Sequence, residues 1–181
     1  YFLNIYSTLN ILLENLQILN LVAILLVLLI FNFRNKLFMG VSGAYSLSFI
    51  IGYLLISIYE NNLFISPYFI VLLLWYPCFE NLFSILRKLN REFSPLKPDS
   101  KHLHQLVFFF LTKKFNLKLI ISNNLSSLII CFFNFLIIYI STLNPSSTIF
   151  QIKLIATSVV FYNACYILLF KFYKSKLISK K

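Results

Sequence analysis

Acidic side chains are almost missing from this sequence. Only 5 of its 181 residues are Asp or Glu, against 16 Lys or Arg, which leaves a formal net charge of +11. Charged residues of both signs make up 12% of the chain. A water-soluble domain of this length needs a far more polar surface than that, so the composition argues against one.

Cysteine is scarce too, and its copies form no motif. Cys78, Cys131 and Cys165 each lie within an apolar run, and no Cys-x-x-Cys spacing occurs. We interpret them as small buried hydrophobic residues, so no disulfide framework is predicted. The chain begins with Tyr1, and no basic start of a signal peptide precedes the first apolar run. We therefore interpret the sequence as the C-terminal part of a longer chain.

Apolar residues are what the sequence has in abundance. It is 60% hydrophobic, with 21 Phe and 11 Tyr, and its mean hydropathy is +0.84. This predicts an integral membrane protein with an all-α fold, a polytopic helix bundle that forms a single membrane domain over residues 1–181. Windows of about 20 apolar residues predict about five transmembrane helices. They are Leu16–Phe33, Gly43–Tyr59, Pro67–Leu86, Leu119–Leu143 and Ile152–Phe172. Polar side chains interrupt residues 1–15, which we interpret as the remnant of an earlier helix followed by a loop.

Lysine and arginine are segregated by loop, and this sets the predicted topology. All but one of the 16 basic residues follow the first or the third predicted helix or lie in the C-terminal tail. The exception is Lys153. Because basic loops stay on the cytoplasmic side, we predict that the chain starts outside and ends inside. The segregation also argues against nucleic acid as a partner and for contact with the anionic headgroups of the bilayer.

Residues 87–118 are predicted to form a cytoplasmic basic loop, which is longer than a plain connection usually is. The third helix is expected to continue beyond the membrane with basic residues on one face, and Pro95 and Pro98 are expected to end it. An anion such as a diphosphate would meet several positive groups there. In chain order, the polar side chains of interest are Arg87, Lys88, Arg91, Asp99, His102 and His104.

Two stretches resemble motifs of one family of membrane enzymes. PCFENLFSILRKLNREFSPLKPDSKHLHQ resembles the cytoplasmic loop of the polyprenyl-phosphate N-acetylhexosamine-1-phosphate transferases, glycosyltransferase family 4. In that loop a P-x-x-(D/E)-T-L helix leads through basic residues to S-P-x-x-P-D-x-x-H-x-H-H. The matching residues are Pro77, Glu80, Leu82, Arg87, Lys88, Ser94, Pro95, Pro98, Asp99, His102 and His104. FNFRNKLFMGVSGAYSLSF is similar to the family's N-F-(x)n-K-x-F-x-G-D-x-G-x-Y. The matching residues there are Asn32, Phe33, Lys36, Phe38, Gly40, Gly43 and Tyr45.

The resemblance covers about residues 31–113 and implies phosphoryl-sugar transfer. The family moves a phospho-N-acetylhexosamine from a UDP-sugar to polyprenyl phosphate and releases UMP, as in the synthesis of lipid-linked precursors of the cell envelope. It implies Mg²⁺ held by carboxylates. The resemblance assigns the UDP-sugar to His102, His104, Asp99, Arg87, Lys88 and Arg91. Metal ligation by the histidines is disfavoured, because hard Mg²⁺ prefers oxygen.

The sequence departs from the family at the metal. Val41 stands where the family has the Asp of its G-D-x-G motif, and Ser42 beside it is at best a weak neutral ligand. The family's paired-Asp and N-x-x-N-x-x-D-G motifs would lie before residue 1, and Gln105 replaces a third histidine. No complete catalytic set or metal site is therefore predicted. We expect that Mg²⁺ does not bind normally and that this chain does not turn over.

Some positions keep two interpretations. Glu80 is either a functional carboxylate within the membrane or a partner for Arg87 or Lys88. Gly40 and Gly43 either allow a close approach of the backbone or pack helices together. For the whole chain, the alternative is a non-catalytic membrane scaffold or partner subunit that keeps the donor-binding loop. A transporter is disfavoured because, Glu80 apart, no predicted helix carries a charged row.

Overall fold

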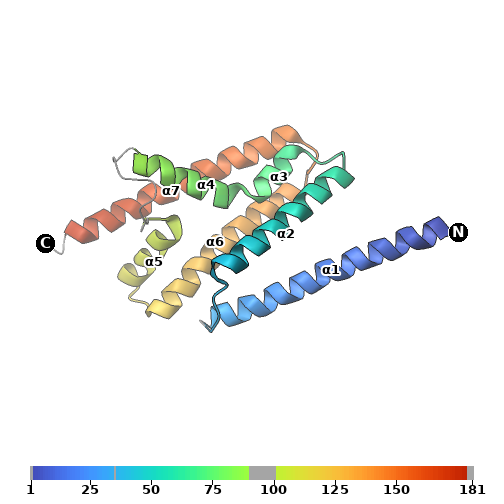
Figure 1. Cartoon of the computed structure of the whole chain (residues 1–181). Helices are drawn as coiled ribbons and strands as arrows, with labels where there is room; N and C mark the ends of the chain where they lie inside the picture. The colour runs from blue at the N-terminus through green and yellow to red at the C-terminus, as the bar shows by residue number, and fades with distance from the viewer. Residues whose placement is uncertain (1, 35, 90–100, 179–181) are drawn as a thin grey trace. The chain divides into compact units, whose positions relative to one another are not determined.

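The computed structural model describes the backbone of residues 2–34, 36–89 and 101–178, and this part of the chain is all-α. Seven helices follow one another along it (Figure 1). They are α1 (Phe2–Phe33), α2 (Gly40–Asn61), α3 (Pro67–Leu73), α4 (Trp75–Leu89), α5 (Leu103–Lys114), α6 (Leu119–Thr142) and α7 (Thr148–Ile178). The predicted all-α fold class is thereby confirmed.

Three of the described helices are long and apolar enough to cross a membrane. They are α2, α6 and the stretch Thr148–Lys176 of α7, and the bent pair α3 and α4 is a fourth candidate. A span takes about 20 helical residues, which the 22 residues of α2 and the 24 of α6 provide. The apolar stretch Ile18–Phe33 of α1 is shorter than these. Three or four spans among the described residues indicate an integral membrane protein.

The chain divides into two compact units, residues 1–54 and residues 55–181. Within the first unit, α1 is one continuous helix of 32 residues. The interruption expected in residues 1–15 is therefore wrong. Phe2–Phe33 contains neither Gly nor Pro, and Asn, Ser, Thr or Glu in a helix interior costs less than about 1 kcal/mol per residue relative to Ala.

The two glycines around Val41 have different local roles. Gly40, where α2 begins, has φ +70°, the left-handed conformation that suits a residue without a side chain. At Gly43 a Cβ atom would lie 2.6 Å from Cγ of Met39. Gly40 therefore serves the backbone, whereas Gly43 leaves room for a neighbouring side chain.

In the second unit, the predicted span Pro67–Leu86 is divided between α3 and α4, which meet with a bend of 68°. Pro77 explains why α3 ends at Leu73. A proline has no N–H to donate to the carbonyl four residues earlier, here that of Leu73, and its ring clashes with that carbonyl. At the break the Leu74 N–H donates to the carbonyl three residues earlier, that of Val71, at 3.2 Å.

The predicted basic loop 87–118 contains α5, a helix that the sequence analysis did not anticipate. Its 12 residues include three buried leucines, and it packs against α6 and α7. Asn116 lies just beyond its C-terminus with φ +55°, the left-handed conformation that commonly ends a helix. Much of the predicted loop is thus a packed helix.

Aromatic side chains dominate the core of the second unit. Trp75 and Tyr162 belong to a buried cluster that draws on α3, α4, α5, α6 and α7. The Phe79 ring lies edge-on to Tyr162 with 5.0 Å between centroids, and the Phe83 ring lies edge-on to Tyr166 at 4.8 Å. In a bilayer, apolar burial drives such packing only weakly, so close van der Waals contact and hydrogen bonds hold the helices together.

Ser66 joins the α2–α3 connection to the α6–α7 connection. Its N–H donates to the Pro145 carbonyl at 3.0 Å, and its hydroxyl lies 3.0 Å from that of Thr148. The same hydroxyl accepts from the Tyr68 N–H at 3.3 Å and caps α3. Pro67 follows as the first helical residue, where a missing N–H costs nothing.

Candidate functional site

The candidate site is built around Glu80, on the inner face of α4. Glu80 is 8% exposed and lies between turns that bury Trp75 and Ser84. A carboxylate at such a depth is costly unless donors surround it. The question is therefore which donors satisfy it.

Donors from two other helices surround the Glu80 carboxylate. Oε1 accepts from the Leu103 backbone N–H at 3.0 Å and lies 2.9 Å from Nδ1 of His102. Oε2 accepts from the Tyr162 hydroxyl at 2.5 Å. The carboxylate thus joins α4 to the start of α5 and to the middle of α7. It also places a negative charge at the N-terminus of α5, where a helix dipole favours one.

The structure bears on one of the two interpretations of Glu80, that of an ion-pair partner for Arg87 or Lys88. Among the described residues, its oxygens contact His102, Leu103 and Tyr162 rather than Arg87 or Lys88. The alternative of a pair with the basic end of α4 is therefore not the arrangement found. The physical reason is distance along the helix, since Arg87 lies about two turns further on and has partners of its own there.

His102 is held at the start of α5 by its backbone as well as its ring. Its N–H donates to Oε1 of Gln105 at 3.1 Å, and its carbonyl accepts from the N–H groups of Gln105 and Leu106 at 3.0 and 3.1 Å. Gln105, interpreted from sequence as a replaced histidine, therefore acts as a helix-capping residue.

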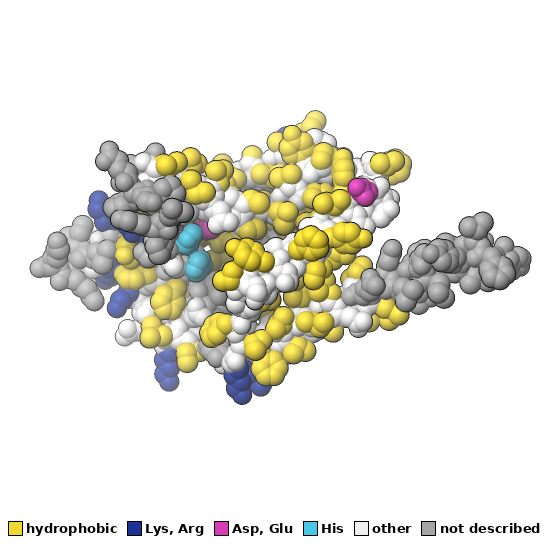
Figure 2. All heavy atoms as spheres, in the orientation of Figure 1, with side chains coloured by type: hydrophobic (Ala, Val, Ile, Leu, Met, Phe, Trp, Pro, Cys, Tyr) yellow, Lys and Arg dark blue, Asp and Glu magenta, His cyan; other side chains and the backbone are white. Residues whose placement is uncertain are grey.

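His104 stacks against His102. The two rings are 5.8 Å apart with 12° between their planes. The His104 ring lies partly open to solvent, and the protein around it lowers its pKa, with a further lowering from His102 and an opposing effect from Glu80. In Figure 2 the histidine side chains gather at one place on the face shown, beside an acidic side chain.

Arg87 connects the end of α4 by a hydrogen bond to Lys101, the residue that precedes His102. Its Nη1 donates to the Lys101 carbonyl at 2.7 Å and to the Tyr166 hydroxyl. The guanidinium also lies over the rings of Tyr166 and Phe83, at 5.3 and 5.7 Å from their centroids. Arg87 is therefore already engaged, and it serves the site by positioning the chain at Lys101.

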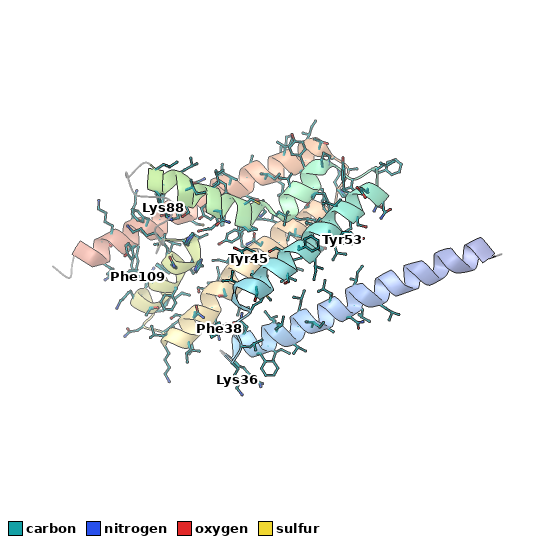
Figure 3. The ribbon with its side chains drawn as sticks, viewed as in Figure 1. Lys36, Phe38, Tyr45, Tyr53, Lys88 and Phe109 are labelled. Atoms are coloured by element: carbon teal, nitrogen blue, oxygen red, sulfur yellow. The ribbon has the colours of Figure 1, made fainter. Side chains whose placement is uncertain are left out.

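The structure brings together part of the predicted site. His102, His104 and Arg87 lie within one cluster of α4, α5 and α7. Lys88 lies at the end of α4 (Figure 3). The predicted residues Asp99 and Arg91 lie outside the described residues. The second motif includes Lys36, Phe38 and Tyr45, in the α1–α2 connection and at the start of α2 (Figure 3). Val41, in the first turn of α2, belongs to the first unit.

Tyr162 and Tyr166 are the site residues that the sequence analysis missed. They lie one turn apart on α7, are 1% and 5% exposed, and supply a hydroxyl to Glu80 and to Arg87 respectively. Their spacing of four residues was the available signal. In a helix with so many aromatic residues, that spacing is no different from ordinary packing.

An apolar pocket of about 660 Å³ extends from the site between α5, α6 and α7. Leu103 and Tyr162, which both contact Glu80, also line this pocket. The rest of its wall is mainly Phe, Leu and Ile. The polar cluster therefore borders an apolar space within the helices.

Among the described residues, no group of three or more His, Cys, Asp or Glu side chains could hold a metal ion. No protein-family model, curated protein or solved structure matches this sequence. Fold and site together define an all-α integral membrane protein with a buried carboxylate that holds a surface histidine.

Proposed function

We propose that the chain binds the diphosphate of a UDP-sugar where α4 and α5 meet, as a relative of the polyprenyl-phosphate N-acetylhexosamine-1-phosphate transferases. One observation carries the proposal: histidines and an arginine of the sequence motif converge on one cluster. The His102 ring contacts the Glu80 carboxylate, and the His104 ring stacks on that of His102. Arg87 donates to the carbonyl of Lys101, the residue before His102. Imidazole N–H groups are suitable donors to phosphate oxygens.

The proposal includes a topology of five spans that starts outside and ends inside a bacterial-type cytoplasmic membrane. α1 is then the first span, α3 with α4 is the third, and α5 lies at the cytoplasmic surface. The basic last turns of α4 and α5 support this arrangement, since Arg87, Lys88, Lys113 and Lys114 fall on the same predicted side. The site would face the cytoplasm, where a nucleotide-sugar is found.

The described residues do not fit the Mg²⁺ that the family resemblance implies. The Glu80 oxygens already contact three donor groups, and Val41 has no oxygen in its side chain. Mg²⁺ prefers about six oxygen ligands, several of them carboxylates and waters. We therefore propose donor binding by this chain and derive no metal-dependent step.

The test is binding of UDP-GlcNAc to the purified chain in lipid nanodiscs. We expect saturable binding that UDP competes for. Replacing both imidazoles, His102→Ala with His104→Ala, should weaken it by at least about tenfold, because each hydrogen bond to a charged oxygen is worth more than 1 kcal/mol. Lys153→Ala, which removes a basic group outside the motif, is the matched control. Equal affinity in the double variant and the control would contradict the proposal.

A second candidate, the non-catalytic scaffold or partner subunit, is favoured by Val41 at the metal position. Both candidates expect bound UDP-GlcNAc to remain intact in the wild-type chain, with no UMP released with or without Mg²⁺. They differ in the Val41→Asp variant. Mg²⁺-dependent release of UMP by that variant, with polyprenyl phosphate present, favours a transferase with one altered ligand. Intact donor in both favours the scaffold.

A further inference from the structure

We infer that Glu80 is a positioning residue for His102. Its carboxylate holds the tautomer of His102 that carries the proton on Nδ1, and thereby turns Nε2 away from the carboxylate and towards the ligand. The identity of that ligand as a nucleotide-sugar phosphate rests on the proposed function. The carboxylate–imidazole geometry does not.

The groups around Glu80 indicate that its carboxylate is ionised. Its two oxygens accept a backbone N–H from Leu103 and the hydroxyl of Tyr162, at 3.0 and 2.5 Å. The start of α5 adds a helix terminus that favours negative charge. An ionised carboxylate, which only accepts hydrogen bonds, fits these surroundings.

The contact with Glu80 determines which ring nitrogen of His102 carries the hydrogen. Nδ1 lies 2.9 Å from Oε1 of Glu80, which is hydrogen-bond distance. Because an ionised carboxylate cannot donate, Nδ1 must carry the hydrogen. In a neutral ring Nε2 is then the acceptor, and in a charged ring it is a second donor. Either way the ring direction is fixed by Glu80.

The exposure of the cluster indicates that Glu80 positions His102 and does more than support the fold. Exposure rises in one direction through the cluster: Tyr162 is buried, and the side chains of Glu80 and His102 are 11% and 23% exposed. Of these three side chains, His102 is the one that solvent or a ligand can best reach. The Glu80 carboxylate accepts a hydrogen bond from the buried Tyr162 hydroxyl and contacts the partly exposed His102 imidazole. It therefore orients that imidazole, as carboxylates do for metal-bound and catalytic histidines.

The backbone completes the arrangement. The N–H and the carbonyl of His102 are both hydrogen-bonded to Gln105, so the start of α5 fixes the Cα–Cβ direction. The ring can then move only by rotation about the Cα–Cβ and Cβ–Cγ bonds, and the contact with Glu80 restricts both rotations. We therefore expect an ordered His102 ring before any ligand arrives.

Nitrogen NMR of the histidine ring tests the inference directly. The chain has only 2 His, so a His104→Gln variant in nanodiscs, labelled with ¹⁵N-histidine, reports His102 alone. At about pH 8.5, where an ordinary imidazole is neutral, we expect the Nδ1–H tautomer. Adding Glu80→Ala should shift the ring to the Nε2–H tautomer that predominates in free histidine. Adding Glu80→Gln should keep Nδ1–H, because the amide oxygen still accepts.

Two controls distinguish positioning from folding. Tyr162→Phe removes another partner of the same carboxylate and should leave the tautomer unchanged, as should Glu60→Gln on the exposed end of α2. An Nε2–H tautomer without Glu80→Ala, no change on Glu80→Ala, or an equal change with Tyr162→Phe would overturn the inference.

UDP-GlcNAc binding by the same variants in the His104-containing chain tests the ligand. Glu80→Ala should weaken binding by about tenfold or more, as loss of an orienting carboxylate typically does, while Glu80→Gln recovers most of the affinity. If the tautomer responds as expected but no variant binds UDP-GlcNAc, the positioning role of Glu80 stands and the proposed function fails. If binding is present but does not respond to Glu80→Ala, the proposed function stands and the positioning role towards the ligand fails.

Discussion

Two polar clusters lie along α7 and differ in chemistry. In its first turns, Gln151 accepts from the Ser141 hydroxyl at 2.7 Å and donates to the Ser141 and Asn144 carbonyls at 3.1 and 2.9 Å. About three turns further on, Tyr162 donates to Glu80, which holds His102. The first cluster contains only neutral groups, whereas the second contains a carboxylate and a histidine.

The difference in exposure matches the difference in chemistry. Gln151 and Ser141 are both 0% exposed, and their hydrogen bonds close the α6–α7 turn on itself. Glu80 is also buried, but its partner His102 extends to the surface. A neutral cluster satisfied entirely within the protein stabilises a fold. A buried charge whose partner reaches the surface costs more to maintain and has a group available for a ligand.

Removing the charged group should have the largest effect on stability. Glu80→Ala leaves the Tyr162 hydroxyl, the Leu103 N–H and the His102 ring without their acceptor. We expect the free energy of unfolding to fall by about 3 kcal/mol, because buried donors to a charged acceptor lose both the bond and their solvation. Denaturation in mixed micelles measures this. A loss no greater than that of Glu60→Gln, on the exposed end of α2, would show that Glu80 is not a structural centre.

Removing the neutral amide should cost less and leave the site intact. Gln151→Leu removes the acceptor of the Ser141 hydroxyl and the side-chain donor to the Ser141 and Asn144 carbonyls, and we expect a loss of about 2 kcal/mol. Because the turn lies away from His102, UDP-GlcNAc affinity and the His102 tautomer should match those of the wild type. A change in either would mean that the neutral and the charged cluster are coupled through α7 and do not act separately.

A smaller change sharpens the comparison within the charged cluster. Tyr162→Phe removes one donor to Glu80 while keeping the ring that packs against Phe79 and Phe83. The expected loss is about 1–2 kcal/mol, for one hydrogen bond to a charged group. The same denaturation assay applies, with Tyr139→Phe on the exposed face of α6 as control. Equal losses in the two variants would remove Tyr162 from the cluster.

The sequence predicted the composition-driven part of this structure and missed its contacts. Long apolar runs identify α2 and α6 because hydropathy alone decides where a membrane helix can lie. The break in the third span was also accessible, since Pro77 forbids the hydrogen bond to Leu73. α5 was missed because polar and basic residues at both ends of a short Phe-rich run are equally typical of a cytoplasmic loop.

The candidate site could be predicted only as a list of local residues. His102, His104 and Arg87 stand out because motif spacing is visible along the chain. Tyr162 does not, because its contact with Glu80 joins residues 82 positions apart, and such pairing depends on how α4 and α7 pack. For the same reason the sequence offers only the local residues Arg87 and Lys88 as ion-pair partners for Glu80, and the distant partner Tyr162 depends on three-dimensional packing.

The smallest expected effect is a pH dependence that only the charged cluster can produce. Burial and the neighbouring His102 hold the pKa of His104 below its ordinary value of 6.5, with Glu80 opposing them. The unfolded chain therefore binds a proton at His104 more readily than the folded chain does. Stability from this group is complete above about pH 6.5 and is lost as the pH falls from there through the lower folded pKa. His104→Gln should flatten that decline in micelle denaturation. An identical decline of stability in His104→Gln would show that another group causes the pH dependence. The neutral cluster has no group that titrates in this pH range, so a decline altered by Gln151→Leu would also contradict the assignment to His104.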